Sequence, residues 1–331
     1  MDDAGPSTDA GLSADSGAVP VDAGASDAGA TDSGLGDAGP SDAGAIDSGV
    51  LDAGRGAFGF TWTQHNVFVA AAQKSKVANL HMYGWGMKWP FAADAPSGEA
   101  DDGGLFAARL NAAVADGQDV MLTACCAPST FAASGVAWDL DSTRVSDAGI
   151  ALYAQRVAQL VARHPAITSV QVWNEFKGFW SSSKNRWNYE DYTAFYDAVY
   201  AAVKAARPAV KVGGGYVALR RRGTSNDALY NGVSVDRRDM DAMKYWMMNA
   251  AGFDAVCVDG NFSPAQYPLL HQYLRDLPES KGRPIYWSEF YVPADGGTMA
   301  QAATELGKVM REGDRALWWA ETAYLPFSVP Y

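Results

Sequence analysis

The sequence predicts a single (β/α)8 barrel that is preceded by a disordered linker. Eight short runs rich in β-branched and aromatic residues are spread over residues 57–321, and amphipathic stretches separate them. The runs are continuously apolar rather than alternating, which is typical of parallel strands that helices cover. Eight such repeats closing on themselves form a barrel, and barrels of about this length are commonly single domains.

Residues 1–54 are expected to be a disordered acidic linker of low complexity. They contain eleven aspartates and no lysine, arginine, glutamate or aromatic residue, and the aspartates recur every five residues from Asp22 to Asp52. Such a segment cannot bury enough apolar surface to offset its chain entropy. Calcium binding is the alternative, but the repeat lacks the nonapeptide pattern of calcium-binding β-rolls. The catalytic domain is therefore placed at residues 55–331.

The charge distribution excludes several classes of partner. The formal net charge is −12, and the linker carries −11 of it, so residues 55–331 are nearly neutral. Neither nucleic acid nor an anionic membrane surface is therefore an expected partner. No run of 18 apolar residues occurs, so no membrane span is expected. Cys125, Cys126 and Cys257 do not form a disulfide framework; buried free thiols are expected, with a bridge between the two neighbours as the alternative.

Each predicted strand is a short apolar run bounded by polar or small residues. The eight runs cover residues 57–62, 77–83, 119–125, 168–174, 210–216, 253–259, 284–290 and 315–321. An open, doubly wound sheet is the alternative arrangement. It would usually carry a glycine-rich phosphate turn after its first strand, and "FTWTQHN" offers none.

Helical periodicity is clearest between the third and fifth predicted strands. In residues 147–164, the apolar side chains of Ile150, Tyr153, Val157 and Leu160 share one helical face. Residues 189–208 repeat this pattern, with a proline at the end of the helix. After the last predicted strand, "TAYLPFSVPY" contains two prolines that forbid a regular helix. The eighth helix is therefore expected to be short or missing, or the sequence to be a fragment.

Two glutamates occupy the expected position of chemistry in such a barrel, the carboxyl ends of the strands. Glu175 ends the run "VWNEF" on the fourth strand, and Glu289 ends "YWSEF" on the seventh. Strands four and seven lie on opposing sides of a barrel, so the two carboxyls can converge over its axis. Carboxyls about 5–5.5 Å apart suit double-displacement glycoside hydrolysis, with one protonated and the other ionised.

These motifs resemble glycoside hydrolase clan A, the retaining (β/α)8 enzymes. The stretch "VWNEFKGFW…YTAFYDAVYAAVKAARPAVKVGGGYVAL" is most similar to proteins related to glycoside hydrolase family 39. The resemblance implies that Glu175 is the acid/base and Glu289 the nucleophile. It also implies that Asn174 hydrogen-bonds a sugar hydroxyl, and that Trp319, or its neighbour Trp318, forms a stacking floor for a sugar ring.

The sixth strand departs from the pattern of these relatives. Its "VCVDGNF" places Asp259 and Asn261 where the relatives have neutral hydrogen-bonding residues. The additional carboxylate would either raise the pKa of Glu289 by like-charge repulsion or serve a substrate with an amino group. Further substrate-binding candidates near strand ends are His65, Tyr83, Trp85 and Trp180.

The sequence thus predicts a retaining glycosidase that acts on an oligo- or polysaccharide without a cofactor or metal. A carbohydrate-binding barrel that has lost catalysis is the alternative. An aldolase or metal-dependent hydrolase is disfavoured, because no lysine sits at a strand tip and the four histidines show no paired spacing. A monomer is expected.

The linker also predicts the location of the protein. It resembles the spacers behind the signal peptides of secreted or surface lipoproteins in some Gram-negative bacteria. The protein is therefore expected to be secreted, or tethered to the cell surface through a lipoprotein signal that this sequence lacks.

Overall fold

The computed structural model describes residues 56–62, 75–101, 103–134, 144–293 and 296–319. The predicted linker and the segment after residue 319 lie outside the described residues, and the prediction about the eighth helix lies there with them. None of the helices in the described part of the chain combines the length and apolarity that crossing a membrane requires.

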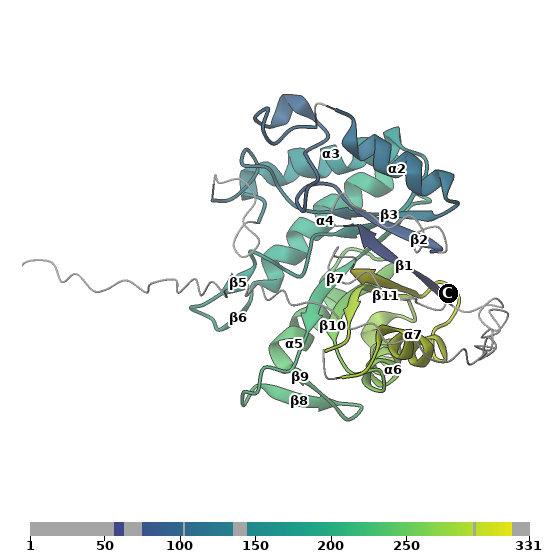
Figure 1. Ribbon diagram of the computed structural model, residues 1–331. Helices are drawn as coiled ribbons and strands as arrows, with labels where there is room; N and C mark the ends of the chain where they lie inside the picture. Colours follow the sequence, from purple (N-terminus) through teal and green to yellow (C-terminus); the bar gives the residue numbers. More distant parts are fainter. Residues whose placement is uncertain (1–55, 63–74, 102, 135–143, 294–295, 320–331) are drawn as a thin grey trace, which may run out of the picture. The chain divides into compact units, whose positions relative to one another are not determined.

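Eight parallel strands close into a barrel, as the sequence predicted (Figure 1). Their order around the barrel is β1-β12-β11-β10-β7-β4-β3-β2, so each strand pairs with the next barrel strand along the chain and β12 closes onto β1. The strands are β1 (Ala57–Trp62), β2 (Val77–His81), β3 (Asp119–Ala124), β4 (Ile167–Val172), β7 (Lys211–Leu219), β10 (Ala255–Asn261), β11 (Ile285–Tyr291) and β12 (Arg315–Trp319).

Within the described residues, six α-helices lie in the connections between successive barrel strands from β2 to β12. They are α2 (Leu105–Ala115), α3 (Ile150–Arg163), α4 (Tyr189–Ala206), α5 (Arg237–Asn249), α6 (Gln266–Asp276) and α7 (Met299–Gly307). Two short hairpins were not predicted: β5 (Trp180–Ser181) with β6 (Arg186–Trp187), and β8 (Asp227–Tyr230) with β9 (Val233–Asp236). Both hairpins lie in connections that follow the carboxyl ends of barrel strands.

The main core lies between the barrel and the surrounding helices. The predicted apolar face of α3 is buried there, with Tyr153, Val157 and Leu160 fully enclosed. The first turn of α5 is stabilised by a side-chain cap. The side chain of Asp236 accepts a hydrogen bond from the backbone N–H of Arg238 at the start of α5.

The lower part of the barrel interior is packed without spare room. Val77, Met121, Cys257 and Leu317 belong to a separate buried cluster there. A Cβ atom added at Gly59 would lie 2.1 Å from the carbonyl oxygen of Val77, so only glycine fits at that position. The interior is therefore a filled core and not a channel.

A layer of polar side chains lies inside the barrel between this floor and the mouth. The Asn79 amide donates to Thr61 Oγ1 at 3.1 Å and its Oδ1 accepts from Thr123 Oγ1 at 2.8 Å. Thr61 Oγ1 in turn donates to the backbone carbonyl of Ser288 at 2.6 Å. These bonds join β1, β2, β3 and β11 just below their carboxyl ends, which fixes the strands that carry the candidate site.

The expectation of free thiols at the neighbouring cysteines was wrong. Cys125 and Cys126 form a disulfide with an S–S distance of 2.00 Å, buried at the end of β3. The backbone N–H of Tyr83 donates to the Cys125 carbonyl and the N–H of Cys126 donates to the Tyr83 carbonyl, so the segment just after β2 holds both cysteines in place. Cys257 is free and buried, as predicted.

Candidate active site

The turn after β4 projects Glu175 from the end of an apolar strand. Its backbone has positive φ at three residues that are not glycine: 69° at Trp173, 50° at Glu175 and 56° at Phe176. This region is unfavourable for residues with a Cβ atom, and such conformations persist only where the surroundings enforce them. The polar end of this strand is therefore a constructed turn and not a simple exit to solvent.

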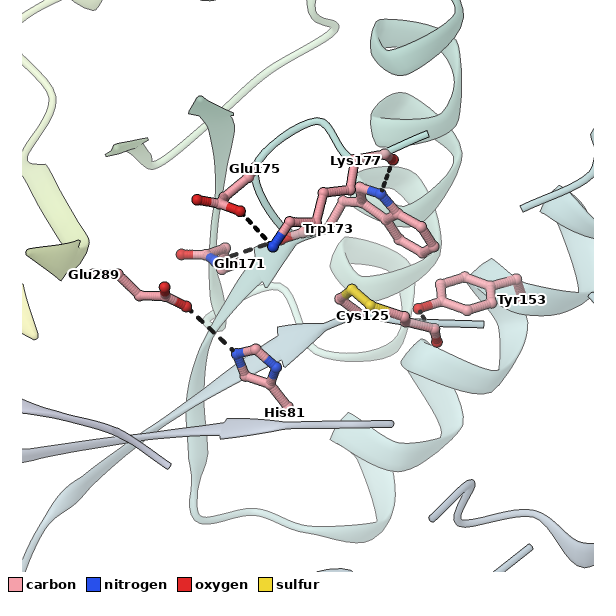
Figure 2. The surroundings of a disulfide bond; sticks show 9 residues. His81, Cys125, Tyr153, Gln171, Trp173, Glu175, Lys177 and Glu289 are labelled. Atoms are coloured by element: carbon pink, nitrogen blue, oxygen red, sulfur yellow. Dashed lines mark hydrogen bonds and ion pairs between the residues drawn. A yellow bond between two sulfur atoms is a disulfide. The ribbon is translucent and has the colours of Figure 1, made fainter. Parts of the chain in front are cut away.

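Packing against α4 enforces this turn. The indole Nε1 of Trp173 donates to the Lys177 carbonyl at 2.7 Å, which closes the turn across four residues (Figure 2). Tyr192 of α4 donates to the Val172 carbonyl at 2.9 Å, and its ring stacks on Phe176 with centroids 3.7 Å apart. The carboxyl of Glu175 is thus held above the barrel end and forms an ion pair with Lys177.

Glu289 approaches the same space from β11. Its side chain is buried, and Tyr291 donates a hydrogen bond to its Oε2 at 2.8 Å. The imidazole Nε2 of His81, from β2, lies 4.0 Å from its Oε1 (Figure 2). Burial, reinforced by the positive charge of Lys177, lowers the pKa of His81 to about 3. His81 is therefore a neutral imidazole at neutral pH.

Three carboxyls converge at the mouth of the barrel. One oxygen atom from each of Glu175, Asp259 and Glu289 can be chosen so that all three lie within 4.8 Å of one another. Asp259 and Glu289 are also paired in the register of β10 and β11. Oxygen sets of this kind can bind a divalent cation, but the ammonium of Lys177 already compensates the charge of Glu175.

The three carboxyls do not all ionise at neutral pH. The pKa of Glu175 is lowered: burial opposes ionisation, but a hydrogen bond from Asp259 and the adjacent Lys177 outweigh it. Burial, together with the hydrogen bond to Glu175 and its charge, raises the pKa of Asp259 well above its usual value. Asp259 is therefore the protonated partner of an ionised Glu175.

The pKa of Glu289 is raised to about 7, chiefly by burial and then by the negative charge of Glu175. From the sequence, Asp259 was considered as the like charge that would raise it. The neighbouring charge that acts on Glu289 is instead that of Glu175, because Asp259 keeps its proton. Of the three carboxyls, Glu289 is therefore the one whose protonation changes near neutral pH.

Asn174 lies beside the cluster with unsatisfied hydrogen-bonding capacity. Its side chain is 1% exposed, and neither its Nδ2 nor its Oδ1 has a hydrogen-bond partner among the described residues. Both ring nitrogens of His81 are buried and lack a hydrogen bond within the same part of the chain. Buried polar groups are normally paired, so these atoms are available to a ligand that carries hydroxyl groups.

The other predicted binding residues divide between the site and its surroundings. Trp85 meets His81 edge-on with centroids 4.6 Å apart, and its ring lies 5.3 Å from the Lys177 ammonium. Asn261 lines the cleft beside Glu175. Tyr83 instead donates to Glu99 at 3.2 Å and is nearly fully buried.

Two tryptophans from the prediction pack elsewhere. Trp180 lies on the β5–β6 hairpin, where it contacts Trp187 edge-on and the guanidinium of Arg238. Trp318 is buried and packs against Phe60 and Phe290 in the layer outside the barrel. His65 and the side chain of Trp319 lie outside the described residues.

Several residues of the site were missed from the sequence. Lys177 and Tyr291 each follow a predicted glutamate by two positions, and His81 lies within a predicted strand. In a strand, residues two apart share a face. Tyr291, which shares β11 with Glu289, could therefore have been inferred, whereas the turn geometry that directs Lys177 toward Glu175 could not.

A cleft of about 700 Å³ opens beside the carboxyl cluster. Its lining includes Glu175 and Asp259, together with residues at the carboxyl ends of β7, β10 and β11 and in the β8–β9 hairpin. A volume of this size accommodates a small-molecule ligand or part of a longer chain. The site therefore combines buried carboxyls with an open cleft at the carboxyl end of a barrel.

Comparison with known proteins defines the fold class. No protein-family profile and no curated protein sequence matches the chain. The chain is similar to the endo-1,4-β-D-mannanase of Thermotoga petrophila RKU-1, with a TM-score of 0.53, 11% identity, and coverage of 80% of this chain and 87% of that one. It is also similar to a xylanase from Cellvibrio japonicus, with a TM-score of 0.51, 12% identity, and coverage of 86% and 92%.

A third similar structure is the family 30 subfamily 8 xylanase of Clostridium acetobutylicum, with a TM-score of 0.50 and 14% identity. That comparison covers 82% of this chain but 66% of the xylanase, which is just under two thirds of its length. The similar solved structures include glycoside hydrolases of several families, in agreement with the resemblance to clan A. At these identities the similarity establishes the barrel fold.

Proposed function

We propose that this protein is a retaining glycoside hydrolase that cleaves glycosidic bonds of an oligo- or polysaccharide by double displacement. The observation that carries the proposal is the convergence of Glu175 and Glu289, with Asp259, within 4.8 Å at the mouth of the barrel. Inverting enzymes need carboxyls about 6.5–9.5 Å apart to admit a water molecule, whereas retaining enzymes need them closer. The glycoside hydrolases among the similar folds support the same class.

In this mechanism, Glu175 protonates the leaving oxygen while Glu289 attacks the anomeric carbon. A covalent bond forms between Glu289 and the sugar as the glycosidic bond breaks. Water then attacks the anomeric carbon while Glu175 takes a proton from it. The bond between the sugar and Glu289 breaks, so Glu289 leaves as a carboxylate and Glu175 is protonated again. The site must therefore hold a proton on Glu175 and a negative charge on Glu289 when the substrate is bound.

The electrostatics of the cluster supports this redistribution of protons. Glu289 has a pKa of about 7, so it ionises readily near neutral pH, and more readily once Glu175 is neutral. Asp259 holds a proton in a hydrogen bond to Glu175. The proton that Glu289 releases as it ionises is available to Glu175, while Asp259 keeps its own.

The neutral groups around the cluster suit sugar hydroxyls. Asn174 and His81 offer unpaired polar atoms to hydroxyls near the reacting carbon. Trp85, partly exposed at the site, offers an apolar face to a sugar ring. We keep Trp319 as the proposed stacking floor, on the resemblance alone.

One observation favours a second candidate function, a carbohydrate-binding barrel without efficient catalysis. The ion pair of Lys177 with Glu175 opposes protonation of the proposed acid. In a protein that only binds sugars, this pair would persist in the complex. The two candidate functions therefore differ in whether the bound sugar is hydrolysed, and not in the class of ligand.

A panel of aryl glycosides and polysaccharides tests the proposal. Hydrolysis should occur on at least one substrate, and NMR of the first-formed product should show the anomeric configuration of the substrate. Net inversion would contradict the assignment of Glu289 as nucleophile. Saturable binding of a sugar without any hydrolysis would favour the binding barrel instead.

We further propose that the protein acts outside the cytoplasm. The acidic linker supports this, and so does the Cys125–Cys126 disulfide, because disulfides persist mainly in oxidising compartments. Fractionation of the producing cells, followed by detection with an antibody against the barrel, tests the location. Recovery with cytoplasmic markers alone would contradict it.

A further inference from the structure

The cleft beside the carboxyl cluster has a basic wall. Arg220 and Arg221, which follow β7 directly, line it together with Asn261 and Tyr291. Glu175 and Asp259 are the acidic residues that line the same cleft. Two arginines therefore border the space that the proposed substrate would occupy.

Arg220 differs from its neighbours in having no carboxylate partner among the described residues. Arg222 is held by Asp236 at 3.0 Å and by Asp239 at 3.1 Å. Arg221 lies 4.0 Å from Asp227. No ion pair of Arg220 occurs within the same part of the chain, although Arg220 is close enough to act electrostatically on Glu175.

An unpaired arginine in a cleft is well suited to an anionic ligand. Its planar guanidinium presents parallel N–H donors that match a carboxylate in bidentate geometry. The cleft also supplies neutral partners for hydroxyls, including Asn261 and Tyr291. A sugar that carries a carboxylate would satisfy both kinds of group.

We propose that the substrate is an acidic glycan and that Arg220, assisted by Arg221, binds the carboxylate of a uronic acid residue in it. This inference rests on the proposed glycoside hydrolase function. The lining of the cleft includes Glu175 but not Glu289. The acidic sugar therefore occupies the side of the leaving group, which Glu175 protonates.

The same observations disfavour a substrate with an amino group, which Asp259 suggested from the sequence. Asp259 is buried and keeps its proton beside Glu175, so it supplies no negative charge to a cationic sugar. Arg220 and Arg221 would repel such a sugar as well. The cleft thus selects for a negative group on the ligand.

The test compares acidic oligosaccharides with their carboxyl-reduced counterparts, which keep the linkage but lose the charge. A panel of uronic acid oligosaccharides of different linkage is assayed for hydrolysis, and one sulfated oligosaccharide of a neutral backbone is included. Binding is measured by calorimetry in Glu289→Gln, so that turnover does not interfere. The wild-type barrel should prefer an acidic member of the panel over its reduced form.

Arg220→Gln should lower that preference, measured as the ratio of kcat/KM or of affinity, by about 10- to 100-fold. Arg237→Gln is the matched control, because it removes the same charge from an exposed residue that does not line the cleft. The control should keep the preference of the wild type. Melting temperatures of both variants establish that they are folded.

Three other outcomes of these experiments would each contradict a different part of the two proposals. Equal hydrolysis of acidic and reduced forms would overturn the acidic substrate but leave the glycosidase intact. Preference for the sulfated oligosaccharide alone would contradict the proposal that the bound sugar is a uronic acid. Tight, Arg220-dependent binding of an acidic oligosaccharide without hydrolysis would support the basic wall and overturn the proposed catalysis.

Discussion

Lys177 contacts both the proposed acid, Glu175, and an aromatic side chain. Its ammonium pairs with the Glu175 carboxylate and lies 5.3 Å from the centre of the Trp85 ring. A sugar that stacks on this ring would compete with the ammonium for the same face. Substrate binding could in this way weaken the ion pair and allow Glu175 to take up a proton.

Substitution of the two glutamates should separate their roles. Glu289→Ala should abolish hydrolysis, because no group remains to form the covalent intermediate. Glu175→Ala should lose about 10²- to 10⁴-fold on substrates with poor leaving groups but much less on activated aryl glycosides, which need little acid assistance. Steady-state kinetics with a series of leaving groups measures this difference.

The sequence contains another glutamate that could be the nucleophile in place of Glu289. Glu321 is the last residue of the eighth apolar run in the sequence and lies two positions beyond the end of β12. If Glu289→Ala kept a rate near the wild-type value while Glu321→Ala was inactive, the nucleophile would have been assigned to the wrong carboxylate.

The buried proton on Asp259 should appear in the pH dependence of stability. Its folded-state pKa is raised, mainly by burial, so the folded protein binds more protons than the unfolded chain above pH ~4. The wild type should therefore lose stability as pH rises from this value. Asp259→Asn keeps a hydrogen-bond donor toward Glu175 but cannot ionise. Its unfolding free energy should exceed that of the wild type by roughly 1–3 kcal/mol at pH 7.

Chemical denaturation at a series of pH values measures the difference, with the lowest pH as the internal control. The two proteins should converge as pH approaches 4. A difference that does not grow with pH would show that Asp259 ionises normally in the folded protein.

For individual residues, the sequence predicted the three carboxyls of the site better than the side chains that contact them. Glu175, Glu289 and Asp259 were found because each follows an apolar run at a strand end. His81 was overlooked because one histidine within an apolar run gives no sign of which strand will lie opposite it. The Cys125–Cys126 disulfide was only the alternative to the expected free thiols, because adjacency in sequence says nothing about the local turn that brings the two sulfurs together.

The turn after β4 is the element on which the site depends most. Trp173→Phe should remove the hydrogen bond to the Lys177 carbonyl while keeping an aromatic ring in the core. We expect a loss of about 1–2 kcal/mol in unfolding free energy. We also expect a fall of about tenfold or more in kcat/KM, because the acid would be displaced from its productive position.

Trp246→Phe provides the matched control. Trp246 is equally buried, but its Nε1 has no hydrogen-bond partner among the described residues. It packs on Tyr196 and Phe253, away from the carboxyl cluster. A similar loss of activity in both variants would mean that core volume, and not the closed turn, controls the rate.

Barrel strands were predictable because their signal comes from burial on both faces. All eight lie within three residues of their predicted bounds. The two hairpins of the connections were not predicted. Their strands span only two to four residues and carry mixed polar side chains, so they lack an apolar period. The two hairpins are defined by hydrogen bonding between neighbouring short strands, which cannot be recognised in a single sequence.

For the whole molecule, the barrel should fold independently of the acidic segment. Deletion of residues 1–54 should change the melting temperature by no more than a few degrees and leave hydrolysis in solution unchanged. The reason is that a segment without aromatic residues contributes little apolar burial. Calorimetry and activity assays on the truncated protein, alongside the full chain, measure both quantities.

A large fall in melting temperature on truncation would contradict this prediction. It would mean that the repeat packs on the barrel, despite its composition. The effect of salt offers a second criterion, since an acidic segment bound through its charge would dissociate as ionic strength rises.

The separation of strand ends from connections has a consequence for how such a protein can diverge. The three carboxyls sit on or directly after barrel strands, above a floor where Gly59 leaves no space for a side chain. Arg220 lies just beyond β7, in the connection that also carries the β8–β9 hairpin. Mutations in that connection can alter which sugar is accepted without disturbing the groups that break the bond. A lineage built on this chain could thus exchange its ligands by drift in one loop while its chemistry stayed under strict selection.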